Sequence, residues 1–170
     1  ALNHITFITG GARSGKSRYA QQLAENLSDN PVYLATARIW DDDFRARVQR
    51  HQSDRGPQWQ TIEEEKLLSK HKLNGRVVLV DCITLWLNNF FHDNHYDLER
   101  ALEEAKAEWD RFACQNFTLI VVSNELGMGV HPENEMARKF ADLQGWMNQH
   151  IAATANEVFL TVSGIPLKIK

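Results

Sequence analysis

Short runs of β-branched and other apolar residues alternate along the chain with segments whose apolar residues recur at helical spacing. The β-rich runs cover residues 5–9, 32–36, 77–80, 117–123 and 158–163, with a further short run at 167–169. Helical spacing marks residues 19–27, 98–113 and 137–155. Alternation of this kind predicts an α/β fold with a parallel sheet whose strands are joined by crossover helices.

Two of these runs, 77–80 and 119–122, are apolar without the polar alternation of a half-exposed strand. Strands covered on both faces have this pattern, so we expect these two at the centre of the sheet. The polar segment 41–60 shows no strand pattern and only a short helical signal at 44–48. Long polar segments between core elements tend to be functional, which makes this segment a candidate for chemistry.

Composition narrows the class of protein. The 170 residues are 43% apolar and 24% charged, which predicts one globular domain over residues 1–170 and excludes disordered or disulfide-scaffold chains. A net charge of −3 argues against a nucleic-acid-binding protein. No apolar run approaches the roughly 20 residues that span a bilayer, and the first residues do not resemble a secretory signal, so we expect a cytoplasmic protein. Cys82 and Cys114 form no Cys-x-x-Cys pair, so nothing indicates zinc.

The most specific motif lies between the first predicted strand and the first predicted helix. It fits the pattern G-x-x-x-x-G-K-[ST] and comprises Gly10, Gly11, Ala12, Arg13, Ser14, Gly15, Lys16 and Ser17. Glycines let backbone N–H groups approach a phosphate chain, and the dipole of the following helix favours negative charge there. We therefore predict a nucleotide site, with Lys16 on the β- and γ-phosphates and Ser17 on Mg²⁺.

Two further strands end in polar residues. Asp81 directly follows the apolar run 77–80, at the carboxyl end of a parallel strand, where ligands bind in such folds. We favour a Mg²⁺-binding role for Asp81 over that of a simple turn residue. Asn124 and Glu125 occupy the equivalent place after the run 119–122, and for them a structural hydrogen-bonding role is as well supported as a functional one.

The polar segment is rich in arginine although the chain is acidic overall. Within eleven residues it contains Arg45, Arg47, Arg50, His51 and Arg55. In a helix that begins near residues 41–43, Arg47, Arg50 and His51 share a face. Neighbouring arginines disfavour a protonated histidine, so His51 would be neutral and could act as a nucleophile on a phosphate. A surface histidine in a solvated basic helix is the alternative that the residues alone leave open.

Taken together, these motifs resemble the bifunctional adenosylcobinamide kinase and adenosylcobinamide-phosphate guanylyltransferase family of cobalamin biosynthesis. The resemblance spans nearly the whole chain and is carried by six segments in order, at residues 9–17, 35–37, 46–59, 80–84, 123–129 and 162–168. It implies a RecA-like P-loop fold in three layers. It also implies a homo-oligomer, commonly a trimer.

The family phosphorylates the aminopropanol hydroxyl of adenosylcobinamide with ATP or GTP, and then transfers GMP from GTP to that phosphate through GMP bound to a histidine. The position of that histidine matches His51, which makes His51 and Lys16 the expected catalytic residues and Ser17 and Asp81 the Mg²⁺ ligands. The resemblance extends the nucleotide-binding set beyond the P-loop and Asp81 to Thr36, Ala37, Arg38, Arg47, Gln52, Ser53, Asp54, Arg55 and Glu63. Some relatives carry a second histidine directly before the reactive one, and Arg50 stands there in this chain.

Other functions compete with this hypothesis. A plain small-molecule kinase, in which the basic segment only binds the acceptor or a phosphate, predicts γ-phosphate transfer without covalent nucleotide. A nucleotide-switched binding protein would use the P-loop as a sensor, but the Asn-Lys-x-Asp motif of GTPase switches is absent from the sequence. A nucleic-acid-binding module needs basic and aromatic residues interleaved, and the arginine-rich segment contains no aromatic residue from Arg45 until Trp59.

Overall fold

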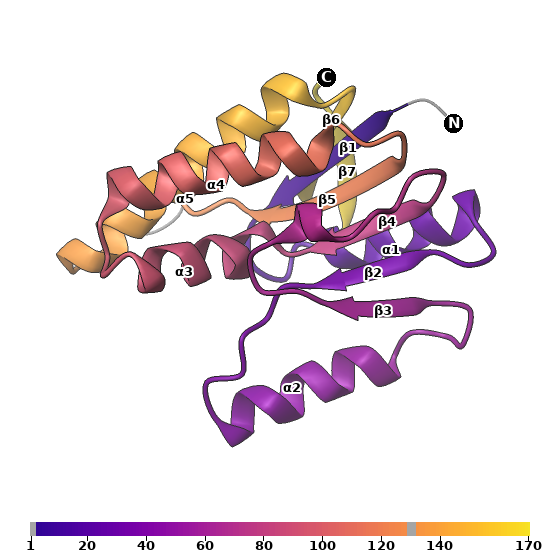
Figure 1. Ribbon diagram of the computed structural model, residues 1–170, viewed down its shortest axis with the longest axis horizontal. Coiled ribbons are helices and arrows are strands. Elements are labelled where there is room, and N and C mark those ends of the chain that lie inside the picture. Colours follow the sequence, from indigo (N-terminus) through magenta and orange to yellow (C-terminus); the bar gives the residue numbers. More distant parts are fainter. Residues whose placement is uncertain (1–2, 129–131) are drawn as a thin grey trace.

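The computed structural model describes residues 3–128 and 132–170 and, in helix α2, does not describe the side chain of His51. Within these residues the chain forms one seven-stranded sheet (Figure 1). The strands are β1 (His4–Gly10), β2 (Val32–Ala35), β3 (Gln60–Glu63), β4 (Val77–Asp81), β5 (Thr118–Asn124), β6 (Glu157–Val162) and β7 (Ile165–Lys168). Their order across the sheet is β3-β2-β4-β5-β1-β6-β7.

Every neighbouring pair in this sheet is parallel except β6 and β7, which form an antiparallel hairpin. The strand β5 lies between the P-loop strand β1 and the strand β4 that ends at Asp81, an order typical of RecA-like P-loop proteins. The prediction of a mostly parallel sheet is confirmed. The apolar runs 77–80 and 119–122 lie in β4 and β5, at the centre of the sheet as expected.

Helices cover both faces and complete three layers. The helices are α1 (Lys16–Leu27), α2 (Asp42–Ser53), α3 (Ile83–Asp93), α4 (Leu98–Ala113) and α5 (Glu135–Thr154), with a short 3₁₀ turn η1 (Leu68–Lys70). Figure 1 shows α3, α4 and α5 together on one face of the sheet, α1 on the other, and α2 below β3 at the edge. Among the described residues, no helix combines the length and apolar character that crossing a bilayer requires.

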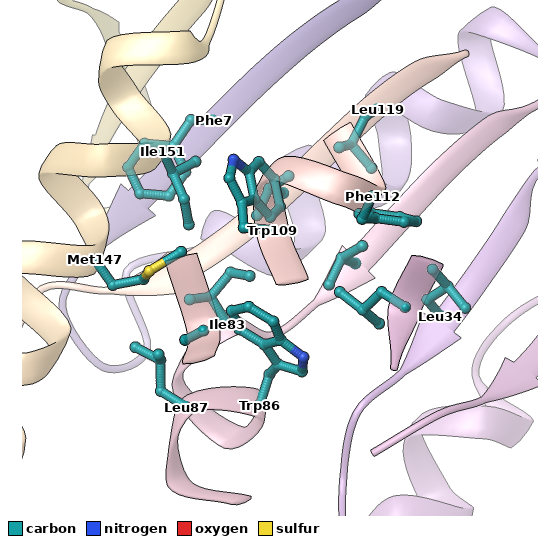
Figure 2. Close-up of a cluster of buried hydrophobic side chains, with 14 of the residues drawn as sticks. Phe7, Leu34, Ile83, Trp86, Leu87, Trp109, Phe112, Leu119, Met147 and Ile151 are labelled. Atoms are coloured by element: carbon teal, nitrogen blue, oxygen red, sulfur yellow. The ribbon is translucent and has the colours of Figure 1, made fainter. Parts of the chain in front are cut away.

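The larger core lies between the sheet and the layer of α3, α4 and α5. Trp86, Trp109 and Phe112 are fully buried there, and Figure 2 shows Trp109 between Met147 of α5 on one side and Phe112 on the other. Burial of aromatic side chains of this size is the largest single source of apolar stabilisation in a fold. This layer therefore fixes the sheet, while α2, which has no fully buried side chain among its described residues, contributes little to the core.

The polar segment differs from the prediction in two ways. Helix α2 begins near residues 41–43 as expected, where Asp41 caps it by accepting a hydrogen bond from the Phe44 N–H at 2.7 Å, but it covers twelve residues and so extends well beyond the signal at 44–48. Strand β3 follows it and was not predicted. Its residues carry no strand pattern because β3 is an edge strand whose side chains are largely exposed.

Candidate active site

The P-loop connects the end of β1 at Gly10 to the start of α1 at Lys16. Gly15 precedes the helix with a φ of +91°, a conformation that glycine adopts without strain. The Lys16 ammonium donates a hydrogen bond of 2.9 Å to the Gly11 carbonyl across the loop. Burial lowers the pKa of Lys16, and the nearby Cys82 and Asp81 limit this shift. The N-terminus of α1 and the Lys16 ammonium thus lie on the same loop, and together they form the kind of site that binds phosphate.

The turn between β6 and β7 packs against the P-loop. The Gly164 N–H donates a 2.7 Å hydrogen bond to the Ser14 carbonyl. A methyl group on Gly15 would lie 3.0 Å from the Gly164 Cα, so the two backbones are in close contact. Ser163 and Gly164 both have positive φ, at +50° and +81°, as the tight turn of a two-residue hairpin requires. The C-terminal hairpin therefore helps to hold the phosphate loop in place.

A cavity of about 160 Å³ lies where the P-loop helix, β4 and α2 meet. It is lined by Ser17, Tyr33, Ala35, Ala37, Val48, Gln52, Arg55, Asp81 and Leu85. Ser17 and Asp81 come from parts of the chain more than sixty residues apart. The structure thus brings together five residues of the predicted site: Ser17, Ala37, Gln52, Arg55 and Asp81.

Tyr33 contacts two other residues that line this cavity, Asp81 and Arg55. Its hydroxyl donates a hydrogen bond of 3.2 Å to Asp81 Oδ2, and the Arg55 guanidinium lies 3.5 Å above its ring. Burial and the Asp81 carboxylate raise the pKa of Tyr33 well above its ordinary value, so the hydroxyl keeps its proton and remains a donor. One side chain thus orients a carboxylate and stacks under a cation.

The residues present fit a nucleotide and Mg²⁺. The Ser14 hydroxyl in the P-loop is buried and has no hydrogen-bond partner within the described part of the chain, as expected for a group that awaits a ligand oxygen. Ser17 and Asp81 offer a hydroxyl and a carboxylate oxygen to one cavity, and oxygen ligands of this kind suit Mg²⁺. Both observations agree with the roles predicted for the P-loop.

Helix α2 presents one side to the cavity. Val48 and Gln52, four residues apart, line it, and the exposed residues of the helix include Arg47 and Arg50. His51 lies in α2 directly before Gln52, and its side chain falls outside the described residues. The guanidinium of Arg47 packs over the Phe44 ring at 5.7 Å.

A second, larger cavity of about 500 Å³ adjoins the first and shares Ala35, Ala37 and Val48 with it. Its remaining lining includes Arg38, Ile39 and the carboxylates of residues 63–65. Gln52 Nε2 lies 3.4 Å from Glu63 Oε1, which joins the two cavities through α2 and β3. A carboxylate beside apolar walls can accept hydrogen bonds from a flat polar ring such as a nucleobase.

The other predicted nucleotide ligands have different surroundings. Thr36 is buried and its hydroxyl donates to the Cys82 carbonyl at 2.8 Å, so it positions the chain after β4. Ser53 donates to the Arg50 carbonyl, and Asp54 caps the end of α2. Neither Ser53 nor Asp54 lines the two cavities, whereas Arg38 and Glu63 line the larger one.

Of the residues that line the smaller cavity, sequence reasoning missed Tyr33, Ala35, Val48 and Leu85. Tyr33 left a signal, because it is the one residue with a polar side-chain group within Val32–Ala35. A tyrosine hydroxyl on a buried strand needs a partner, which predicts a polar group at the neighbouring strand end. Val48 and Leu85 left no comparable signal, because an apolar wall cannot be distinguished from core in the sequence.

Comparison with known proteins agrees with this geometry. A family model described as cobinamide kinase / cobinamide phosphate guanyltransferase matches residues 6–169. The chain belongs to this family. The family resemblance expected from the motifs is confirmed, and with it the prediction of a P-loop enzyme of adenosylcobalamin biosynthesis.

Three family members show the extent of the similarity. The protein named bifunctional adenosylcobalamin biosynthesis protein CobU is 40% identical in Escherichia coli, over 98% of this chain and 99% of that protein. The protein of the same name from Salmonella typhimurium is 38% identical, over 98% of this chain and 99% of its own length. A Pseudomonas aeruginosa protein named bifunctional adenosylcobalamin biosynthesis protein CobP is 38% identical, covering 96% of this chain and 95% of that protein.

Proposed function

We propose that this chain phosphorylates adenosylcobinamide with ATP or GTP and then converts the product to adenosylcobinamide-GDP through a covalent GMP–His51 intermediate. The observation that carries the proposal is the shared cavity, in which Ser17 and Asp81 face Gln52 and Arg55. The helix that holds His51 thus borders the phosphate-binding end of the sheet. A loop that binds β- and γ-phosphates leaves the α-phosphate directed outward, where a residue of another segment can attack it.

In the first reaction, the substrate hydroxyl oxygen attacks the γ-phosphorus of the nucleotide. A new P–O bond forms, the bond to the β-phosphate breaks, the hydroxyl proton is released and a nucleoside diphosphate leaves. Lys16 stabilises the negative charge on the transferred phosphoryl group. Ser17 and Asp81 would hold Mg²⁺, which neutralises phosphate charge when it is bound.

In the second reaction, an imidazole nitrogen of His51 attacks the α-phosphorus of GTP. A P–N bond forms, the P–O bond to the β-phosphate breaks, and pyrophosphate leaves. A phosphate oxygen of adenosylcobinamide phosphate then attacks the same phosphorus and releases the histidine. Arg55 contributes positive charge from its place above Tyr33 in the cavity, and Arg47 adds charge on the outer side of α2.

We assign the larger cavity to the guanosine of GTP. Glu63 offers a carboxylate to the N–H groups of the guanine edge, and Ala37 and Val48 supply apolar walls. Arg38 lines the same cavity but its guanidinium is hydrogen-bonded to Glu65 and Asp93, so it shapes the wall rather than contacting phosphate. Thr36, Ser53 and Asp54 position the chain around the site.

Intact-mass spectrometry after incubation with GTP and Mg²⁺ tests the covalent step. We expect an acid-labile gain of one GMP in the wild type and in Gln49→Ala, a change at an exposed position of the same helix, and no gain in His51→Ala. His51→Ala should still transfer the γ-phosphate to adenosylcobinamide, whereas Lys16→Ala should lose both reactions. Nucleotide turnover without any adduct in the wild type would leave the plain kinase, and an adduct in His51→Ala would identify another nucleophile.

We also propose a homo-oligomer. The edge strand β7 exposes Ile165 and Leu167, with Val162 next to them on β6, and exposed apolar side chains in a group indicate a contact surface. Pro166 lacks a backbone donor and blunts this edge, so subunits would associate through side chains rather than by extending the sheet. Sedimentation at assay concentration tests this expectation, and a monomer contradicts it.

A further inference from the structure

A group of exposed aromatic side chains lies beside the larger cavity, and Trp40, His92 and Tyr96 line neither of the two cavities described above. Trp40 is 47% exposed and packs edge-on against His92 at 4.9 Å between ring centroids. His92 in turn contacts Tyr96, which is 39% exposed. Ile39, next to Trp40, is also exposed. We call these four residues, Ile39, Trp40, His92 and Tyr96, the aromatic platform.

Ion pairs of Arg38 and Lys66 lie next to the platform. The Arg38 guanidinium lies 5.6 Å from the Trp40 ring centroid and donates hydrogen bonds of 2.8 and 3.1 Å to both oxygens of Asp93. Lys66 pairs with the same carboxylate at 3.1 Å. The hydrogen bonds from Arg38 hold the pKa of Asp93 well below its ordinary value, so the network stays charged at neutral pH. Trp40 thus has ordered neighbours on two sides, Arg38 and His92, while its ring remains half-exposed.

The turn that carries Tyr96 is strained. His95 and Tyr96 both have positive φ, at +53° and +64°, although neither is glycine. Such residues cost free energy and persist only where the surrounding structure fixes them, and they cluster at ligand-binding sites. Here the turn is fixed by hydrogen bonds from the N–H groups of His95 and Tyr96 to the carbonyls of His92 and Phe91.

The platform is continuous with the nucleotide site. Ile39 of the platform lines the larger cavity together with Ala37 and Val48. In Figure 1 the connection from β2 to α2 and the whole of α3 extend from the carboxyl ends of the strands, where the P-loop also lies. A substrate that reaches the P-loop cavity with one end can therefore contact the platform with the other.

We propose that the aromatic platform binds the corrin ring of the acceptor, an inference that rests on the proposed function. A corrin is a broad, flat ring whose cobalt centre leaves it with a net positive charge, and its phosphate lies at the end of a flexible arm. Apolar rings pack on aromatic side chains, and the aspartates at residues 41–43, directly after Trp40, complement a cation. The phosphate arm then extends toward Arg55 and the P-loop, which complement an anion.

Trp40→Ala tests this assignment, and Trp146→Ala is the matched control, because Trp146 is 46% exposed on α5 and belongs to no part of the site. Each variant is assayed for GMP adduct formation with GTP alone and for steady-state transfer to adenosylcobinamide phosphate. We expect Trp40→Ala to form the adduct normally and to raise the KM for the corrinoid about tenfold with little change in kcat, the loss typical of one aromatic contact. Trp146→Ala should match the wild type in both assays.

Three results would overturn the platform while leaving the proposed function intact. An unchanged KM in Trp40→Ala shows that the ring does not contact Trp40. Loss of the GMP adduct in Trp40→Ala assigns Trp40 to the nucleotide site instead, once a thermal melt has shown that the variant is folded. A shift in sedimentation coefficient for Trp40→Ala identifies the patch as a contact between subunits. A wild type that forms neither adduct nor corrinoid product overturns the proposed function, and the platform with it.

Discussion

Gly10, the last residue of β1, is packed closely against both the neighbouring strand β6 and the P-loop. A methyl group at this position would lie 2.7 Å from the Thr161 carbonyl oxygen, inside the 3.0 Å below which real Cβ contacts essentially do not occur. Gly10 and Thr161 are partners in the ladder between β1 and β6, so the oxygen cannot rotate away. The same methyl would lie 2.6 Å from the Ser14 hydroxyl. Gly10→Ala must therefore displace either β6 or the phosphate loop.

The neighbouring Gly11 provides the matched control. No atom lies within 4 Å of a methyl group placed on it, and its φ is not positive. We expect Gly10→Ala to lower the free energy of unfolding by about 1–3 kcal/mol, the usual cost of overpacking, and the melting temperature by about 2–12 °C. Gly11→Ala should change the free energy of unfolding by less than about 1 kcal/mol, and we expect an increase.

Urea unfolding of the nucleotide-free protein measures both variants, because the buried Trp86 and Trp109 report loss of the core by fluorescence. Omitting nucleotide matters, since either change can alter phosphate binding and with it the apparent stability. The reasoning is refuted if Gly10→Ala is as stable as the wild type, or if Gly11→Ala loses as much stability as Gly10→Ala.

Three further changes follow from other contacts. Tyr33→Phe keeps the ring under Arg55 but removes the hydrogen bond to Asp81. The affinity for GTP, measured by calorimetry, should therefore fall about three- to tenfold with Mg²⁺ and stay unchanged in EDTA. Equal losses of affinity in both buffers contradict the role of Asp81. Gly145→Ala, in the middle of α5 with open space around the new methyl, should raise the free energy of unfolding by about 0.5–1 kcal/mol in urea. Asp93 has a depressed pKa, so its stabilisation is complete above the ordinary aspartate value near pH 4 and declines as the pH falls below it. Asp93→Asn should therefore cost about 1 kcal/mol at pH 7 and progressively less below pH 4, and a loss that is independent of pH counts against the ion pair with Arg38.

The buried strands could be predicted from the sequence because burial leaves a pattern. The runs 77–80 and 119–122 are apolar on both faces, and the structure places them in the two central strands β4 and β5. The P-loop could also be predicted from the sequence. Position 15 requires a positive φ and position 16 requires a positive charge, and few residues other than glycine and lysine meet these requirements. Where local chemistry dictates residue type, the sequence is sufficient.

The edge of the sheet could not be predicted in the same way. Strand β3 is exposed on most of its residues and carries no alternation, so only its pairing with β2 reveals it. The cavity walls Val48 and Leu85 are apolar residues that any helix uses for packing. The contact of Gly164 with Ser14 joins positions 150 residues apart, and nothing local to either residue indicates it.

The P-loop is supported by the sheet, whereas helix α2 lies at the edge of the fold. This difference suggests how one site supports both phosphoryl transfer and guanylyl transfer. The P-loop follows a strand that is paired on both sides, and the β6–β7 turn supports it, so the position of a bound triphosphate is fixed by the sheet. In the proposed mechanism the γ- and α-phosphates then lie at different points, and the acceptor that approaches each point decides the reaction. Among the described side chains of helix α2, Val48 and Gln52 line this region. We therefore expect changes on α2 to alter guanylyl transfer without altering phosphoryl transfer, whereas changes in the loop or in its hairpin support alter both.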